Sequence, residues 1–187
     1  MKKITIILVV LLVAGTHAWA QSQFASVSGK VEVRPASGGS WTVAEVGMEL
    51  DRNTVISTGF NASAEVQMGA STVTIEQLTR LEFQEIVERS NSVETDLRLK
   101  VGSVRAQVRS VDQRSQDFRV SSPISTAAVR GTDFVYSGRE LSVQEGDVAF
   151  SNLIGQQHSV RAGQTSRTWK HAPFETVEAT IADDLQL

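Results

Sequence analysis

The side chains able to do catalysis or metal chemistry are few in this sequence and widely separated. Beyond residue 20 the histidines are His158 and His171, which lie in different segments, and the 187 residues include no cysteine. A zinc site needs three or four converging nitrogen, sulfur or carboxylate ligands, so this pattern predicts no metal site. The sequence has no Gly-x-Ser-x-Gly elbow and no glycine-rich phosphate loop. We therefore expect neither a metal nor another cofactor.

Carboxylates are plentiful enough to supply the acid pair of a glycosidase. Charged residues that alternate with apolar ones are, however, the ordinary outer face of β-strands. Trp41, Tyr136 and Trp169 are too few and too scattered to indicate a carbohydrate-binding platform. We therefore expect a protein that works by binding and is not an enzyme.

The charge of the chain is mildly acidic and has no block of one sign, with a formal net charge of −3. Without Lys2 and Lys3, 16 basic and 21 acidic residues remain, which is a net charge of −5. A nucleic-acid surface needs basic residues gathered on one face. Nothing in the sequence indicates such a face, so we expect no nucleic-acid partner.

The first 20 residues have the pattern of a secretory signal peptide. Lys2 and Lys3 precede an apolar run from Ile4 to Ala14, and Ala18-Trp19-Ala20 supplies a small-x-small cleavage site. The alternative is an uncleaved anchor, but the run is shorter than the ~18–20 apolar residues of a spanning helix. We predict cleavage after Ala20, export to the periplasm or cell envelope, and no integral membrane segment afterwards.

The remaining sequence alternates between apolar and polar residues as β-strands do. Residues 65–68 and 72–75 flank Gly69-Ala70-Ser71 as a hairpin would, and the charged residues 85–91 could extend a strand or form a loop. We predict an all-β fold: a single antiparallel β-sandwich or β-roll-like domain over residues 21–168. The tail, residues 169–187, could form a short acidic helix or be disordered.

Two changes of phase interrupt this alternation, and each occurs at a glycine. Apolar residues switch from odd to even positions across Gly102-Ser103 and again across Gly146-Asp147. Each pair could be a two-residue hairpin turn or a bulge where the strand bends from one sheet to another. Gly29-Lys30-Val31 adds a third Gly-x-Val unit, at no fixed spacing from the others. The sequence alone leaves both interpretations open.

The segment from Ser121 to Phe134 resembles the signature of the FecR domain family, in which Ser-Pro or Thr-Pro is followed by Val-Arg-Gly-Thr-x-Phe. Three further segments are similar to family motifs and follow the family's order: Leu99–Val104, Val143–Val148 and Val160–Gln164. The resemblance covers roughly residues 29–164. Its motif residues are Pro123, Arg130, Gly131, Thr132, Phe134, Glu145, Gly146 and Gly163.

Two interpretations of these motif residues stay open. Arg130 and Thr132 could contact a ligand, or they could hold two sheets together through buried hydrogen bonds. Pro123 ends a strand, and Gly131 permits an unusual backbone conformation or a close approach of another chain. We predict that Arg130 is held by a carboxylate, with Glu145 as its partner.

The resemblance implies a role in signalling across the cell envelope. Better-known FecR-type proteins span the membrane, receive a signal in the periplasm from an outer-membrane receptor and control a cytoplasmic sigma factor. We expect no sigma-factor-binding segment before Gly29, so the chain resembles the periplasmic sensor domain alone. We therefore expect an exported binding or sensing module whose partner is another envelope protein. The alternative is an envelope structural or glycan-binding protein, with peptidoglycan as one such glycan.

Overall fold

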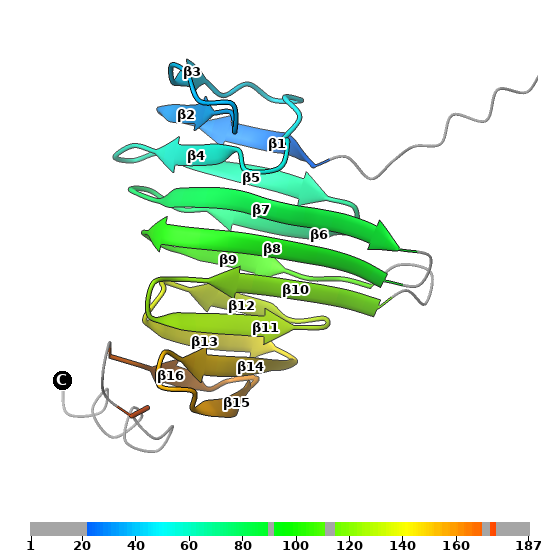
Figure 1. Ribbon diagram of the computed structural model, residues 1–187, viewed down its shortest axis with the longest axis vertical. Coiled ribbons are helices and arrows are strands. Elements are labelled where there is room, and N and C mark those ends of the chain that lie inside the picture. Colours follow the sequence, from blue (N-terminus) through cyan, green and yellow to red (C-terminus); the bar gives the residue numbers. More distant parts are fainter. Residues whose placement is uncertain (1–21, 90–91, 111–114, 170–172, 175–187) are drawn as a thin grey trace, which may run out of the picture.

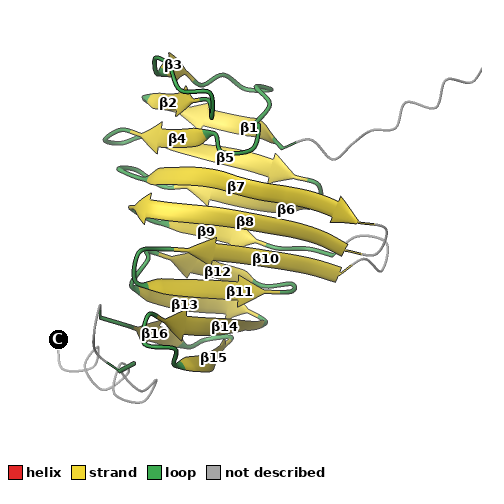
Figure 2. Cartoon of the chain, in the orientation of Figure 1, coloured by secondary structure: helices red, strands yellow, loops and turns green. Residues whose placement is uncertain are grey.

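The computed structural model describes residues 22–89, 92–110, 115–169 and 173–174. Two β-sheets face each other, and the strands of each follow the chain order along the long axis of the molecule, except for two short strands exchanged at one edge of the larger sheet (Figure 1). Figure 2 shows strands joined by loops, and the described residues contain no helix. The expected all-β sandwich is confirmed.

One sheet has seven strands. In spatial order they are β1 (Gln23–Ser28), β5 (Ser63–Met68), β6 (Ser71–Ile75), β9 (Val104–Gln107), β12 (Asp133–Tyr136), β13 (Glu140–Glu145) and β16 (Thr165–Arg167).

The other sheet has nine strands. In spatial order they are β15 (Gln157–Arg161), β14 (Asp147–Asn152), β11 (Ser125–Val129), β10 (Ser115–Ser121), β8 (Ser92–Val101), β7 (Arg80–Arg89), β4 (Val55–Thr58), β2 (Val31–Arg34) and β3 (Thr42–Val43).

The core lies between the sheets and follows the two-residue period of the strands. In β6, for example, Val73 and Ile75 are fully buried while Thr72 and Thr74 face outward. One continuous cluster of buried side chains runs from Phe24 near one end of the stack to Phe150 and Val160 near the other. Burying one large apolar side chain contributes roughly 1.5–3 kcal/mol. This cluster therefore supplies the stability that a chain without disulfides needs.

The phase changes in the sequence mark places where the chain passes from one sheet to the other. Gly29 joins β1 to β2, Gly102 lies between β8 and β9, and Gly146 joins β13 to β14. The three glycines have φ angles of 71°, 91° and 86°, which other residues rarely adopt. The bend between sheets is therefore the correct alternative, and none of these units is a hairpin turn within one sheet.

The expected hairpin is also confirmed, since β5 and β6 pair in antiparallel register with Met68 opposite Ser71. Strand β7 continues to Arg89, so most of the charged segment 85–91 extends a strand. One pair differs from the antiparallel expectation, because β8 and β10 are parallel. After β8 the chain crosses to the seven-stranded sheet and returns along β9. Strand β10 therefore starts at the end of the molecule where β8 started, and the two strands run in the same direction.

The predicted signal peptide lies outside the described residues, and so does the tail except for Trp169, Pro173 and Phe174. The Phe174 ring packs 5.0 Å from the ring of Phe150, measured between centroids. Among the described residues, no helix has the length and apolar character needed to cross a membrane.

Candidate functional site

The Ser-Pro segment of the FecR-like signature forms a hydrogen-bonded turn between β10 and β11. The Ser122 hydroxyl donates to the Gly138 carbonyl at 2.8 Å and accepts from the Ser125 backbone N–H at 3.0 Å. The phenol of Tyr136 donates to the Ser125 carbonyl at 2.9 Å. Burial raises the pKa of this phenol above its ordinary value, so it remains a donor. Pro123 lies in this turn with its side chain exposed, and the turn is structural.

The two best-matched motifs meet where Thr132 packs on Gly146. A Cβ atom at Gly146 would lie 2.6 Å from Thr132 Cγ2 and 2.9 Å from the Gly131 carbonyl oxygen. Thr132 is buried, and its carbonyl accepts a hydrogen bond from the Val108 N–H at 2.8 Å. Phe134 is fully buried and meets Phe118 edge to face. Among the described residues, Thr132 Oγ1 is buried without a hydrogen-bond partner. Thr132, Phe134 and Gly146 therefore join the sheets through packing, and the expected buried hydrogen bonds between sheets are not formed by the side chains of Arg130 or Thr132.

The predicted pair of Arg130 and Glu145 is wrong. Arg130 Nε lies 3.1 Å from Asp117 Oδ1, and its side chain is 81% exposed. Glu145 instead contacts Arg109, with Arg109 Nη2 3.1 Å from Glu145 Oε2. Arg130 follows β11 in the nine-stranded sheet, whereas Glu145 ends β13 in the seven-stranded sheet. The two motifs lie close together in the fold, but the side chains of Arg130 and Glu145 belong to different sheets and have different partners.

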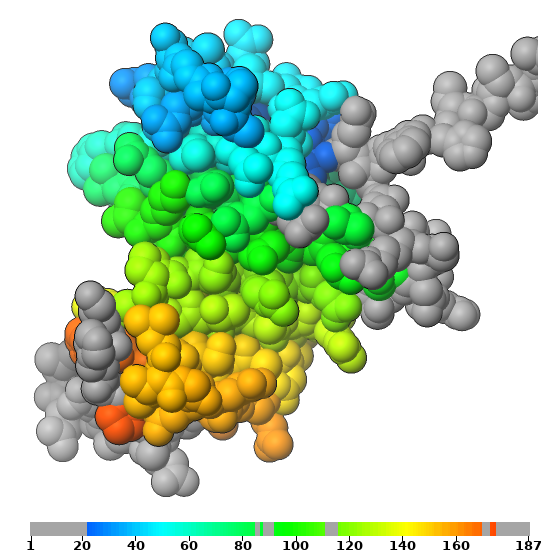
Figure 3. Space-filling view, viewed as in Figure 1, coloured from blue at the N-terminus to red at the C-terminus, as the bar shows by residue number. Residues whose placement is uncertain are grey.

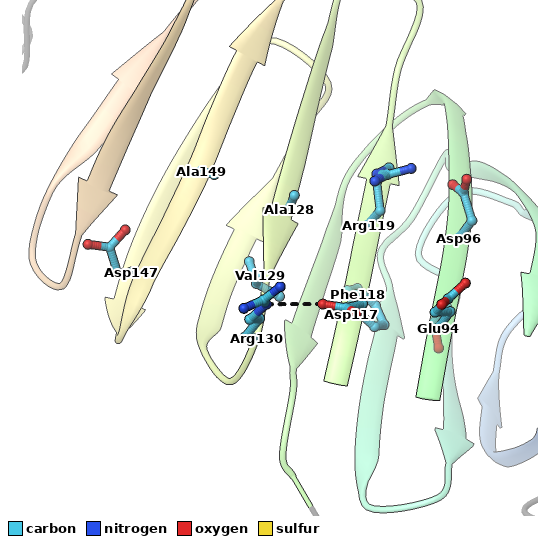
Figure 4. A pocket seen from close by; sticks show the side chains of 11 residues that line it. Glu94, Asp96, Asp117, Phe118, Arg119, Ala128, Val129, Arg130, Asp147 and Ala149 are labelled. Carbon is cyan, nitrogen blue, oxygen red and sulfur yellow. Dashed lines mark hydrogen bonds and ion pairs between the residues drawn. The ribbon is translucent and has the colours of Figure 1, made fainter. Parts of the chain in front are cut away.

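A shallow hollow of about 700 Å³ lies on the outer face of the nine-stranded sheet, across β8, β10, β11 and β14 (Figure 4). We call it the outer-face hollow. Its lining residues are Glu94, Thr95, Asp96, Asp117, Phe118, Arg119, Ala128, Val129, Arg130, Asp147 and Ala149. Figure 3 views the molecule from this side.

The floor of the hollow exists because two small side chains lie side by side. Ala128 in β11 pairs in register with Ala149 in β14. Both side chains point outward, since their neighbours Val129, Val148 and Phe150 are buried in the core. Larger side chains stand around the alanines, as Figure 4 shows for Arg119 and Arg130. The pair thus leaves room for a bulky side chain from outside.

The charged groups around this floor differ in their partners. Arg130 is held by Asp117, and Asp147 accepts from the Ser159 hydroxyl and has Arg161 Nε 3.8 Å from its Oδ2. Arg119 is exposed and makes no hydrogen bond or ion pair within the part of the chain that the structure describes. Its guanidinium keeps five N–H donors available to a carboxylate. The hollow can therefore bind a charged group without first breaking an ion pair of Arg119.

The same described residues offer no metal site and no accessible serine hydrogen-bonded to a histidine. No three His, Cys, Asp or Glu side chains there lie close enough to hold a metal ion. His158 Nε2 lies 2.9 Å from the Ser166 hydroxyl, but Ser166 is fully buried, so a substrate could not reach it. Burial lowers the pKa of His158 below its ordinary value. This pair therefore serves the packing of the core.

The sequence motifs identified only one residue of the hollow as a site candidate, Arg130. Gly163 lies in the turn between β15 and β16, outside the lining of the hollow, with a φ angle of 79° and open space within 4 Å of where a Cβ would lie. The sequence does indicate that Asp117 and Arg119 face outward from a strand, because they alternate with the apolar residues Phe118 and Val120. The adjacent Ala128 and Ala149 could not be found, since their pairing depends on strand order.

Two of three comparisons with known proteins give a match. A family model described as FecR protein matches residues 54–166. Two crystal structures of a candidate anti-sigma factor from Parabacteroides distasonis each match with a TM-score of 0.53 and 13% sequence identity. Each match covers 65% of this chain and 57% of the other, so the chain spans less than two thirds of that protein. No curated protein matches the chain.

Proposed function

The chain belongs to the FecR protein family, and on this premise we propose that it is an exported binding module of the cell envelope that recognises a partner protein through the outer-face hollow. FecR-type proteins regulate by contact with other proteins, and the similar solved structure is named as an anti-sigma factor. This likeness shows a similar fold and nothing more. We therefore infer the class of partner from the family to which the chain belongs.

The observation that carries the proposal is the unpaired Arg119 beside the floor formed by Ala128 and Ala149. Protein interfaces gain most of their affinity from a few anchors, typically a bulky side chain in a recess together with desolvated polar contacts. Arginine is enriched in such places because its planar head binds carboxylates with two parallel hydrogen bonds. The hollow accordingly fits a partner that brings a large side chain onto the alanines and a carboxylate to Arg119.

The same groups support binding without turnover. The acidic residues of the hollow include Asp117, which is paired with Arg130, and Asp147, which contacts Ser159 and Arg161. A general acid or base has to reach the substrate within hydrogen-bond distance, and these two carboxylates are already held by neighbouring side chains. We therefore propose that the domain catalyses no reaction.

The test begins with a partner captured from envelope extracts by the exported protein and then purified. Binding of that partner should be saturable and should weaken at least about tenfold in Ala128→Trp, which fills the recess, and in Arg119→Glu. Arg105→Glu is the matched control, because Arg105 is an exposed arginine on the outer face of the seven-stranded sheet. The melting temperatures of all variants should stay close to that of the wild type.

Two outcomes would contradict the proposal. If Ala128→Trp and Arg119→Glu bind the partner as well as the wild type does, the outer-face hollow is not the contact surface. If the exported protein instead binds isolated peptidoglycan with an affinity that Arg119→Glu lowers, the occupant is a glycan. Hydrolysis of such a substrate would contradict the claim that the domain only binds.

A further inference from the structure

The exposed apolar side chains gather at one end of the strands. Among the described residues, eight large hydrophobic side chains are strongly exposed, and six of them follow or end strands β4, β6, β8, β14 and β16. These six, each 46–73% exposed, are Phe60, Leu78, Val101, Leu153, Ile154 and Trp169. We call them the apolar rim, which lies on the left in Figure 1.

The opposite ends of the strands have a different surface. The described turns there, at residues 69–70, 130–132, 146 and 162–164, carry no exposed large hydrophobic side chain. The two remaining exposed hydrophobic residues, Val43 and Val46, lie at the β1–β3 end of the stack and outside the rim. The apolar residues are therefore concentrated on one rim and are not spread over the surface as scattered single residues would be.

Hydrogen bonds between successive turns align part of this rim. The Gly59 N–H donates to the Lys30 carbonyl at 2.8 Å, and the Leu78 N–H donates to the Gly59 carbonyl at 3.1 Å. The Ser103 N–H donates to the Thr79 hydroxyl at 3.0 Å. These bonds link four turns that are neighbours in space, namely β1–β2, β4–β5, β6–β7 and β8–β9. Phe60, Leu78 and Val101 therefore lie along one hydrogen-bonded edge.

Leu78 shows that one exposed apolar residue is held at a conformational cost. Its φ angle is 55°, in the left-handed region that favours glycine and asparagine. Its side chain is nevertheless more than half exposed, so burial in this domain does not offset the cost. Such an outlier points to a role outside the fold.

Positive charge is in excess on the same rim. At this end of the strands, the described basic residues within two positions of a turn are Lys30, Arg80, Lys100, Arg105, Arg139 and Arg167. The acidic residues in those positions are Glu32, Glu76 and Glu140. Glu32 pairs with Lys30, Glu140 pairs with Arg167, and Glu82, just beyond those positions, pairs with Lys100. Although the whole chain has a net negative charge, this rim is therefore both apolar and basic.

We propose that the apolar rim docks the domain on a phospholipid membrane that contains anionic lipids. Aromatic and aliphatic side chains beside lysine and arginine are the combination that binds the interfacial region of a bilayer. The long stems of the basic residues allow their charged heads to reach the headgroups while the apolar tips enter the membrane. Trp169, whose ring lies 4.9 Å from the Arg139 guanidinium carbon, combines both features.

The shape of the rim favours a lipid surface over a groove on a protein. The exposed apolar residues come from turns and strand ends distributed along the stack, from the β4–β5 turn to the residues after β16, and only Leu153 and Ile154 share a turn. A bilayer can accept separated tips because it is laterally continuous and deformable. Neighbouring strands lie roughly 4.8 Å apart, so a protein would need an apolar groove as long as the whole stack.

The test uses the absence of cysteine to place one environment-sensitive fluorophore at a time. The exported protein carries the fluorophore at Gln77→Cys, beside Leu78, or at Ala162→Cys, an exposed turn residue of the opposite rim. Each is titrated with vesicles of phosphatidylcholine alone and of phosphatidylcholine with phosphatidylglycerol. We expect a large emission change at position 77 with the anionic vesicles, a smaller one with neutral vesicles and none at position 162.

Variants then separate the apolar from the charged contribution. Phe60→Ser with Leu78→Asn should weaken vesicle binding at least about tenfold, and asparagine tolerates the left-handed backbone at position 78. Val43→Ser with Val46→Ser removes exposed apolar side chains outside the rim and should leave binding unchanged. Arg139→Glu should lower binding to anionic vesicles roughly fivefold or more, because each basic residue near such a surface contributes about that factor.

Several results would overturn the proposal. Equal emission changes at positions 77 and 162 would show adsorption without orientation. Equal binding by the rim variant and the Val43/Val46 control would remove the apolar rim from the contact. A response at position 77 to the purified partner protein, with none to either vesicle, would assign the rim to that protein.

Discussion

Gly146→Ala is expected to destabilise the domain through two costs that add. The φ angle of Gly146 is 86°, and an alanine in this left-handed region costs roughly 1–2 kcal/mol. The new Cβ would also lie 2.6 Å from Thr132 Cγ2 and 2.9 Å from the Gly131 carbonyl oxygen. Forcing an atom into such a packed site costs roughly 1–3 kcal/mol more. The total is about 2–5 kcal/mol.

Gly163→Ala provides the matched control for this prediction. Gly163 has a φ angle of 79°, so the backbone cost is similar, but no atom lies within 4 Å of its Cβ position. We therefore expect a loss of roughly 1–2 kcal/mol. The difference between the two variants isolates the contact between the Arg130-Gly131-Thr132 and Glu145-Gly146 motifs.

Urea unfolding of the purified protein, followed by tryptophan fluorescence, gives both free energies of unfolding. Thermal unfolding should agree, with a shift of roughly 2–4 °C for each kcal/mol in a domain of this size. Equal losses in the two variants, with unchanged denaturant slopes, would refute the reasoning. The two motifs would then not be packed as tightly as the geometry indicates.

Three further predictions concern motif and core residues. Arg130→Ala should cost no more than about 1 kcal/mol, because its ion pair is exposed; a larger loss in chemical unfolding would contradict the surface placement. Phe134→Ala should cost about 3–5 kcal/mol in the same assay, because it empties a fully buried site, and a loss below about 1 kcal/mol would place Phe134 outside the core. Burial lowers the pKa of His158, so the stability from its neutral ring is present above the unfolded-state pKa of about 6.5 and is lost as the pH falls through the folded-state pKa. The wild-type melting temperature should therefore fall more than that of His158→Gln between about pH 7.5 and pH 5.5, and parallel curves would contradict this.

The local elements of the fold could be predicted from the sequence because strand alternation and turn glycines are local signals. The hairpin at Gly69-Ala70 follows from two alternating segments around a glycine. The phase changes at Gly102 and Gly146 also located the bends between sheets, although either interpretation fitted the residues alone.

The arrangement of the candidate surfaces could not be predicted, because it depends on which strands become neighbours. The parallel pairing of β8 with β10 places Asp96 opposite Arg119, and the pairing of β11 with β14 places Ala128 opposite Ala149. The wrong assignment of Glu145 to Arg130 has the same origin, since it rested on each residue lying beside a glycine in a matched motif and not on the order of the strands. The apolar rim likewise joins turns that are far apart in the chain.

Photocrosslinking in living cells tests most directly the claim that the outer-face hollow receives a partner protein. A benzophenone amino acid would replace Ser159, which is exposed and pairs with Ala149 at the margin of the hollow. The control position is Thr74, which faces outward from the seven-stranded sheet. We predict one discrete protein adduct from position 159, lost when Arg119→Glu is added, and none from position 74. The same adducts from both positions, or a position-159 adduct that persists in Arg119→Glu, would contradict the account.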